Sequence, residues 1–136
     1  MVWSNLTWML TGLAAVLVLL TRVRLNVSDG RAAGVTDVSG ALLTWHTTVG
    51  VVALALWITA MSTGSGYLTS VALLAWWVLT LLGLMLLARW LPASGRHADD
   101  KATDEWGKGA GLSLLGHLGM LIGAVYFTFV ALTGRL

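Results

Sequence analysis

The sequence predicts an all-α integral membrane protein, a bundle of four transmembrane helices. Composition is the first indication, because only 10% of the 136 residues are charged, whereas a soluble domain carries about 25%. Length is the second, since four apolar runs each reach the roughly 20 residues that one bilayer crossing requires. Lipid offers the backbone no hydrogen bonds, so each run must be a helix. We expect one domain over residues 1–136, with these spans: about 2–21, 41–61, 71–88 and 111–133.

The four spans differ in the polar side chains that they carry. The first lacks the positively charged start of a secretory signal, so we expect it to remain in the mature protein. The second contains His46 and the fourth contains His117, whereas the third has no ionisable side chain. Ionisable residues inside a membrane are costly and mark function or a specific partner. The two histidines are therefore the candidate functional residues.

The basic residues predict the orientation of the spans. Seven of the eight lie in the two long connections, 22–40 and 89–110, and Arg135 alone lies on the other side of the membrane. Basic residues concentrate in cytoplasmic loops, so we expect both connections in the cytoplasm and both termini outside. The segment 62–70, which contains two glycines, would form a short outer loop.

The eight tryptophans are expected at the two membrane–water boundaries, where this residue is enriched. The outer group comprises Trp3, Trp8, Trp57, Trp76 and Trp77, and the inner group comprises Trp45, Trp90 and Trp106.

The two halves of the chain resemble each other. Trp8-Met-Leu-Thr11 matches Trp77-Val-Leu-Thr80, and Gly40-x-x-Leu43-x-x-His46 matches Gly111-x-x-Leu114-x-x-His117. This pattern predicts two similar hairpins that run in the same direction, a parallel repeat related by an axis along the membrane normal. Each histidine follows its helix start by about six residues, which at ~1.5 Å per residue is roughly 9 Å. Both imidazoles should therefore face that axis at one depth.

Two facing histidines suit the axial ligation of one haem b, because iron accepts imidazole nitrogen on both faces of the macrocycle. Small residues such as Gly50 and Gly119 would leave room for its edges. Arginine binds carboxylates with its planar fork. The haem propionates are accordingly assigned to Arg22, Arg24 or Arg31.

Two other interpretations compete with haem. Histidine, serine, threonine and glycine also occur at ordinary helix interfaces in membranes, in which case the two imidazoles are interhelical hydrogen-bond partners. Proton or ion transport usually recruits carboxylates within the membrane, and the four spans contain none. His97, in the hydrophilic connection, is interpreted as a solvated side chain.

Several function classes are excluded. The chain has no cysteine, hence no disulfide, thiolate metal site or thiol redox chemistry. It has no basic block with interleaved aromatic residues, so we expect no nucleic acid partner. No catalytic residue is assigned, because the spans leave no soluble mass for a separate enzymatic domain.

Four helices with His46 and His117 on alternating spans resemble small membrane cytochromes b. The architecture is also similar to the haem-bearing anchor subunits of succinate dehydrogenase and fumarate reductase. The resemblance implies an electron-transfer or quinone-reactive subunit with one bis-histidine haem b. If quinone binds, the polar residues near the haem that would line its pocket are Thr44, Ser113 or Trp45. Two-haem relatives need four membrane histidines, whereas this chain has two. The alternative is a cofactor-free accessory subunit.

Residue usage and span composition together indicate where the protein works. Alanine, valine, leucine, glycine and arginine are frequent and lysine is rare, as in high-GC bacterial proteins. We therefore expect a multi-pass protein of a bacterial inner membrane. Its partners would be lipid and other membrane subunits, one of which supplies the main activity.

Overall fold

Four long helices make up the part of the chain that the computed structural model describes, residues 2–27, 40–90 and 111–136. The helices are α1 (Val2–Val27), α2 (Gly40–Thr63), α3 (Gly66–Trp90) and α5 (Gly111–Leu132). All four are long and apolar enough to cross a membrane. The prediction of an all-helical protein with four candidate membrane spans is confirmed. The two predicted cytoplasmic connections lie mostly outside the described residues.

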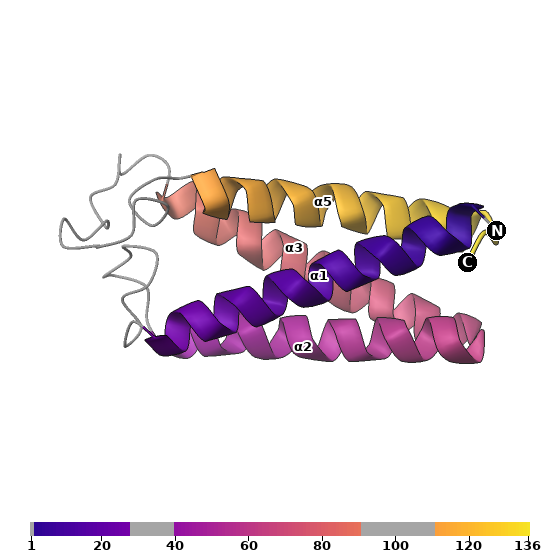
Figure 1. The fold of residues 1–136 in the computed structure, drawn as a ribbon, viewed down its shortest axis with the longest axis horizontal. Coiled ribbons are helices and arrows are strands. Elements are labelled where there is room, and N and C mark those ends of the chain that lie inside the picture. Colours follow the sequence, from indigo (N-terminus) through magenta and orange to yellow (C-terminus); the bar gives the residue numbers. More distant parts are fainter. Residues whose placement is uncertain (1, 28–39, 91–110) are drawn as a thin grey trace.

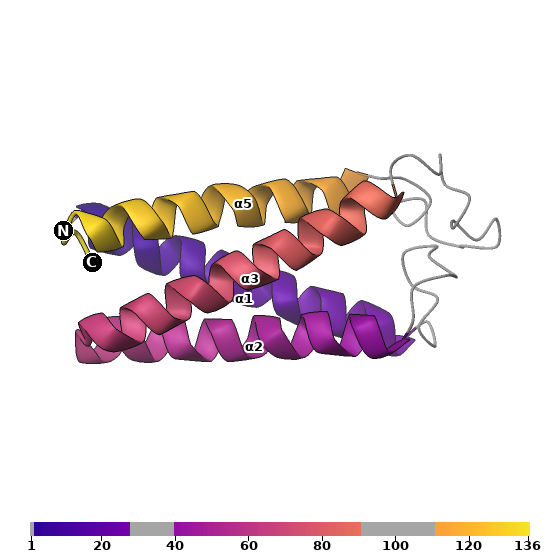
Figure 2. The ribbon, with the colours of Figure 1, turned by 180° about the vertical axis from the view of Figure 1, so that it is seen from behind.

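The helices form a bundle in which α2 and α5 lie diagonally opposite each other. Each of α1 and α3 packs against both α2 and α5, and neither diagonal pair comes into backbone contact among the described residues. Figures 1 and 2 show α1 and α3 crossing on opposite sides of the α2 and α5 pair. Both chain ends and the α2–α3 turn lie at one end of the bundle (Figure 1), which we call the turn end. The ends of the helices that lead into the two long connections lie at the other, the connection end.

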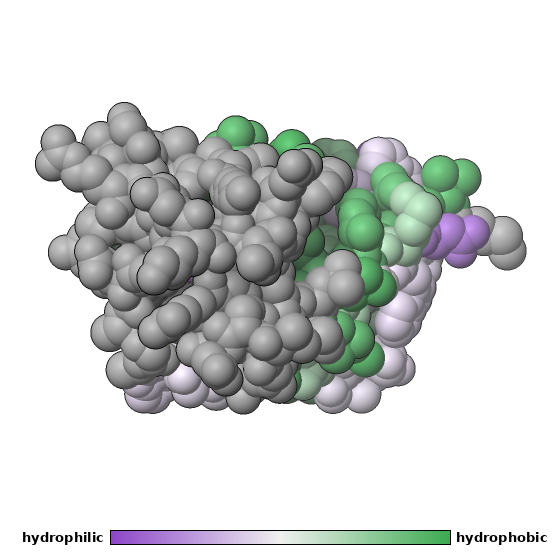
Figure 3. Space-filling view, turned by 60° about the vertical axis from the view of Figure 1, so that its left-hand side comes forward, coloured by the Kyte–Doolittle hydropathy of each residue, from purple (hydrophilic) through white to green (hydrophobic). Residues whose placement is uncertain are grey.

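The outside of the described bundle is apolar. Every helix exposes large hydrophobic side chains, including Leu13 on α1, Val51 on α2, Leu74 on α3 and Ile122 on α5. The described surface in the view of Figure 3 is mainly green and pale purple, the colours of apolar and weakly polar residues, with one deep purple, hydrophilic spot. Such a surface suits contact with lipid tails better than contact with water.

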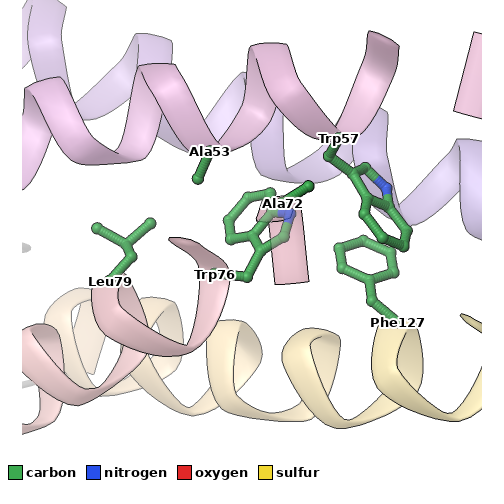
Figure 4. Close-up of a cluster of buried hydrophobic side chains, with 6 residues drawn as sticks. All are labelled: Ala53, Trp57, Ala72, Trp76, Leu79 and Phe127. Carbon is green, nitrogen blue, oxygen red and sulfur yellow. The ribbon is translucent and has the colours of Figure 1, made fainter. Parts of the chain in front are cut away.

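The core at the turn-end side consists of tryptophans packed on alanines. Trp57 of α2 and Trp76 of α3 are buried together with Ala53 and Ala72, and Phe127 of α5 closes the cluster (Figure 4). Its ring centroid lies 4.5 Å from that of Trp57 and 5.8 Å from that of Trp76. Small residues let neighbouring membrane helices approach closely, so the alanines make room for the indoles.

This core contains two of the tryptophans predicted for the outer boundary. Trp57 and Trp76 are 0% and 1% exposed, so their side chains pack inside the bundle and do not face its surroundings. Both indoles face alanines across the α2–α3 interface, where their large ring surface packs among side chains. By contrast, Trp3, Trp8 and Trp45 are 40%, 43% and 67% exposed, as the prediction requires.

The outer loop predicted at 62–70 is much shorter than expected. Helix α2 continues to Thr63 and α3 begins at Gly66. Gly64 has a positive φ of 65° and its N–H donates to the Ala60 carbonyl, an arrangement that ends a helix and favours glycine. The Ser65 hydroxyl accepts from the Leu68 N–H and starts the next helix. Hydroxyl groups at the end of α2 and the start of α3 donate hydrogen bonds to backbone carbonyls one turn earlier, as Thr63 does to Thr59. These polar residues therefore belong to the helices.

Buried hydroxyl groups join α1 to α2 and α5 near the turn end. The Trp57 indole N–H donates to Thr11 Oγ1 at 3.0 Å, and Thr11 in turn donates to the Thr7 carbonyl. Thr7 Oγ1 lies 3.3 Å from the Tyr126 hydroxyl, which also donates to the Trp3 carbonyl. These bonds fix α1, the helix with little other buried surface, to its two neighbours.

Thr11→Val should destabilise the bundle, because it leaves the buried Trp57 N–H without an acceptor. We expect a loss of about 1–2 kcal/mol in the free energy of unfolding. The measurement is unfolding by SDS in mixed micelles, followed by tryptophan fluorescence. Thr59→Val is the matched control, since Thr59 is exposed and bonds only its own helix. Equal effects of the two substitutions would show that the α1–α2 bond does not hold the helices together.

Candidate functional site

His46 and His117 occupy the same position in two diagonal helices. Each is the seventh residue of its helix, and both lie toward the connection end. Their imidazole ring centroids are 6.1 Å apart, with an angle of 21° between the ring planes. Both side chains are partly buried. The two imidazoles therefore converge on one place although α2 and α5 do not themselves touch.

Helix α3 contributes a third residue, Gly83, which the sequence analysis did not single out. It is buried, and a Cβ at this position would lie 2.6 Å from Cδ2 and 3.1 Å from Nε2 of His117. The same atom would lie 3.3 Å from Cε1 of His46. Real Cβ atoms essentially never come as close as 2.6 Å to another heavy atom. Glycine therefore allows α3 to meet both rings in these positions, whereas any side chain would require the His117 ring or α3 to shift.

The Nδ1 atom of His46 is buried without a hydrogen-bond partner among the described residues. Among the described side chains, the buried polar atoms without a hydrogen-bond partner are His46 Nδ1 and the indole nitrogen of Trp76. Leaving such a group unsatisfied costs about 1–3 kcal/mol. Because one imidazole nitrogen donates and the other accepts in the neutral ring, a proton acceptor or a bound group near His46 would recover this free energy.

The spacing of the imidazoles suits one metal centre between them. A metal–imidazole bond is about 2.0–2.1 Å long, and two such bonds in line separate the ring centres by about 6 Å. No group of three or more histidine, cysteine, aspartate or glutamate side chains gathers anywhere in the described part of the chain. That part accordingly offers no closed site built from protein ligands alone. A bis-histidine haem takes two axial protein ligands, because the macrocycle supplies the other four.

The lateral room for a macrocycle is limited on the side of α3. A porphyrin would extend sideways from the line through the two imidazoles and the metal. On the side of α3, the backbone at Gly83 already lies against both imidazole rings. The ring centres are about as far apart as two imidazoles on one iron, but the rings lie stacked and against α3 as they stand. The macrocycle additionally requires α3 and the imidazoles to separate at Gly83.

The other predicted site residues lie at varying distances from the imidazoles. Gly50 is buried one turn beyond His46, where a Cβ would contact Leu79 and Val18 at 3.5–4.0 Å. Gly119 is exposed, with no atom within 4 Å of a Cβ position. The backbones of Arg22 and Arg24 belong to the last turns of α1, which runs six residues beyond its predicted end. Arg31 lies outside the described residues.

Comparison with known proteins assigns this chain to no group. No family model, curated protein or solved structure matches it. The geometry around His46, His117 and Gly83 is therefore the basis for proposing a function.

Proposed function

We propose that this chain is a small membrane cytochrome b-like subunit that holds one haem b between His46 and His117. It would carry electrons within a membrane oxidoreductase complex. One observation supports this most strongly: two imidazoles from diagonal helices meet with ring centres 6.1 Å apart and planes within 21° of parallel. That separation is the one expected for imidazole–metal–imidazole ligation.

In this proposal the chain's residues bind and orient the cofactor. His46 and His117 each present a neutral imidazole nitrogen to the iron, and the half-buried position of both rings limits access of water. The haem, when bound, supplies a one-electron redox centre whose potential the axial ligands help to set. The protein's own contribution is to fix two ligands on two helices at one depth.

The propionates would point toward the connection end, where α1 finishes. Arg22 and Arg24 belong to its last turns, and Arg31 follows in the first connection. An arginine fork can bind a carboxylate through two hydrogen bonds. The assignment of these three residues as propionate partners, with Gly50 and Gly119 beside the macrocycle, remains part of the proposal.

We further propose that the two hairpins are parallel repeats with both termini outside a bacterial inner membrane. Each hairpin contains one interhelical tryptophan–threonine bond of 3.0 Å, Trp57 to Thr11 and Trp77 to Thr128. Trp57 and Thr128 are separated by the same offset as the two histidines. The distribution of basic residues supports the orientation, and residue usage supports the bacterial origin.

A second candidate is a cofactor-free accessory subunit of a larger membrane complex. One observation favours it: α3 packs directly against both imidazoles at Gly83, with no macrocycle needed to complete the contact. Under both candidates, lipid and other membrane subunits are the expected partners. A quinone would act as a redox partner only in the first.

The haem proposal predicts a b-type α-band in the reduced-minus-oxidised spectrum of the purified chain. Each of His46→Ala and His117→Ala should abolish the band, since either change removes an axial ligand. His97→Ala is the control and should retain it. A wild-type protein that is purified without haem and forms no b-type α-band after titration with hemin would favour the accessory subunit.

Haem binding should also move the connection-end half of α3 away from α5. The chain has no cysteine, so pairs can be introduced for spin labels at exposed positions. The test pair is Met85→Cys with Leu115→Cys, and the control pair nearer the turn end is Tyr67→Cys with Leu132→Cys. On loading with haem, we expect the first electron–electron distance to rise by several ångströms and the second to stay constant. An unchanged first distance in a haem-loaded protein would contradict the requirement for separation at Gly83.

A further inference from the structure

At the interface between α2 and α3, each large residue of one helix faces a small residue of the other. A Cβ at Gly83 would face His46, and a Cβ at Gly50 would face Leu79. The same antiparallel register continues with Ala53 opposite Trp76 and Trp57 opposite Ala72, four residues of one buried cluster (Figure 4). At every step one side chain is large and its partner is small. His46 therefore takes the place of a large core residue, and Gly83 that of its small partner.

Gly83 differs from the other small residues because a second large side chain also reaches it. His117 comes from α5, and its ring would lie closer to a Cβ at Gly83 than the His46 ring does, 2.6 Å against 3.3 Å. Three helices thus meet at a single residue. Neither Gly12, Gly119 nor Gly123 has any atom within 4 Å of a Cβ position, so a methyl group there meets open space.

We infer that Gly83 is the positioning residue of the imidazole pair. The absence of a side chain at this position lets both rings converge on α3. A methyl group there would overlap the His117 ring, so it displaces that ring or α3 and changes how the two imidazoles meet. This positioning role deepens the proposed function. It rests on that function only for the identity of the group that the two imidazoles would bind. The convergence itself is a property of the protein without any ligand.

A double-mutant cycle in the ligand-free protein tests the contact between Gly83 and His117. Alanine is the better helix former by about 1 kcal/mol, so without the ring Gly83→Ala should not lower stability. We expect Gly83→Ala to lower the SDS unfolding midpoint of the wild type and to have no such effect in His117→Ala. Gly123→Ala is the control and should show no coupling to His117. The same effect of Gly83→Ala in both backgrounds would overturn the inference.

Histidine-selective ¹⁵N NMR of the ligand-free full chain reports the rings directly, because the chain contains three histidines. Gly83→Ala should shift the imidazole signals of His46 and His117 and leave that of His97 in place. Gly123→Ala should shift none of them. Unchanged signals in Gly83→Ala would overturn the positioning role, whether or not the wild type binds haem.

Titration with hemin completes the test and separates the two proposals. Because haem loading requires α3 to move away from the imidazoles, the methyl group of Gly83→Ala opposes only the ligand-free contact. Gly83→Ala should therefore bind hemin at least as tightly as the wild type, and Gly123→Ala should bind it equally well. If Gly83→Ala shifts both imidazole signals but the wild type binds no hemin, the haem proposal fails and the positioning role stands. If the wild type binds hemin and Gly83→Ala binds it more weakly, the requirement for separation at Gly83 is wrong.

Discussion

The convergence of two imidazoles on a backbone position without a side chain is the constraint on which the rest of this bundle depends. Helices α2 and α5 are diagonal, so their histidines can meet only if the helix between them leaves room. Gly83 leaves that room, since a Cβ there would lie 2.6 Å from His117 Cδ2, so the ring or α3 would have to shift. Polar side chains are expensive inside a membrane, and His46 Nδ1 has no partner among the described residues. The proposed ligation of one metal centre would give both imidazoles a partner.

The two ends of the bundle have different tasks. Near the turn end, the helices are fixed to one another by a tight turn at Gly64, by indoles packed on alanines and by buried hydroxyl groups that bond across helices. The connection end carries the imidazole pair, and its helices lead into long connections instead of a turn. The proposed movement of α3 away from the imidazoles would take place at the connection end, away from these contacts.

Much of the fold could be predicted from sequence, but the contacts that complete the site could not. Four apolar runs of sufficient length predict four spans, and the repeated placement of His46 and His117 predicts that they face each other. The environment of each tryptophan is harder to predict, because an indole suits both a membrane boundary and a core. Only the alanines opposite Trp57 and Trp76 mark these two as core residues. Gly83 stands in a leucine-rich run that offers no periodic signal. Its role follows from the way α3 crosses between two diagonal helices, which no local pattern encodes.

The central claim is that His46 and His117 together hold one iron centre. Near-infrared magnetic circular dichroism of the oxidised protein, purified in lipid and combined with iron analysis, tests this most directly because the charge-transfer band identifies both axial ligands. We expect one iron per chain and the band of a low-spin ferric haem with two imidazole ligands. A protein without stoichiometric iron, or a haem with any other pair of axial ligands, would contradict the claim.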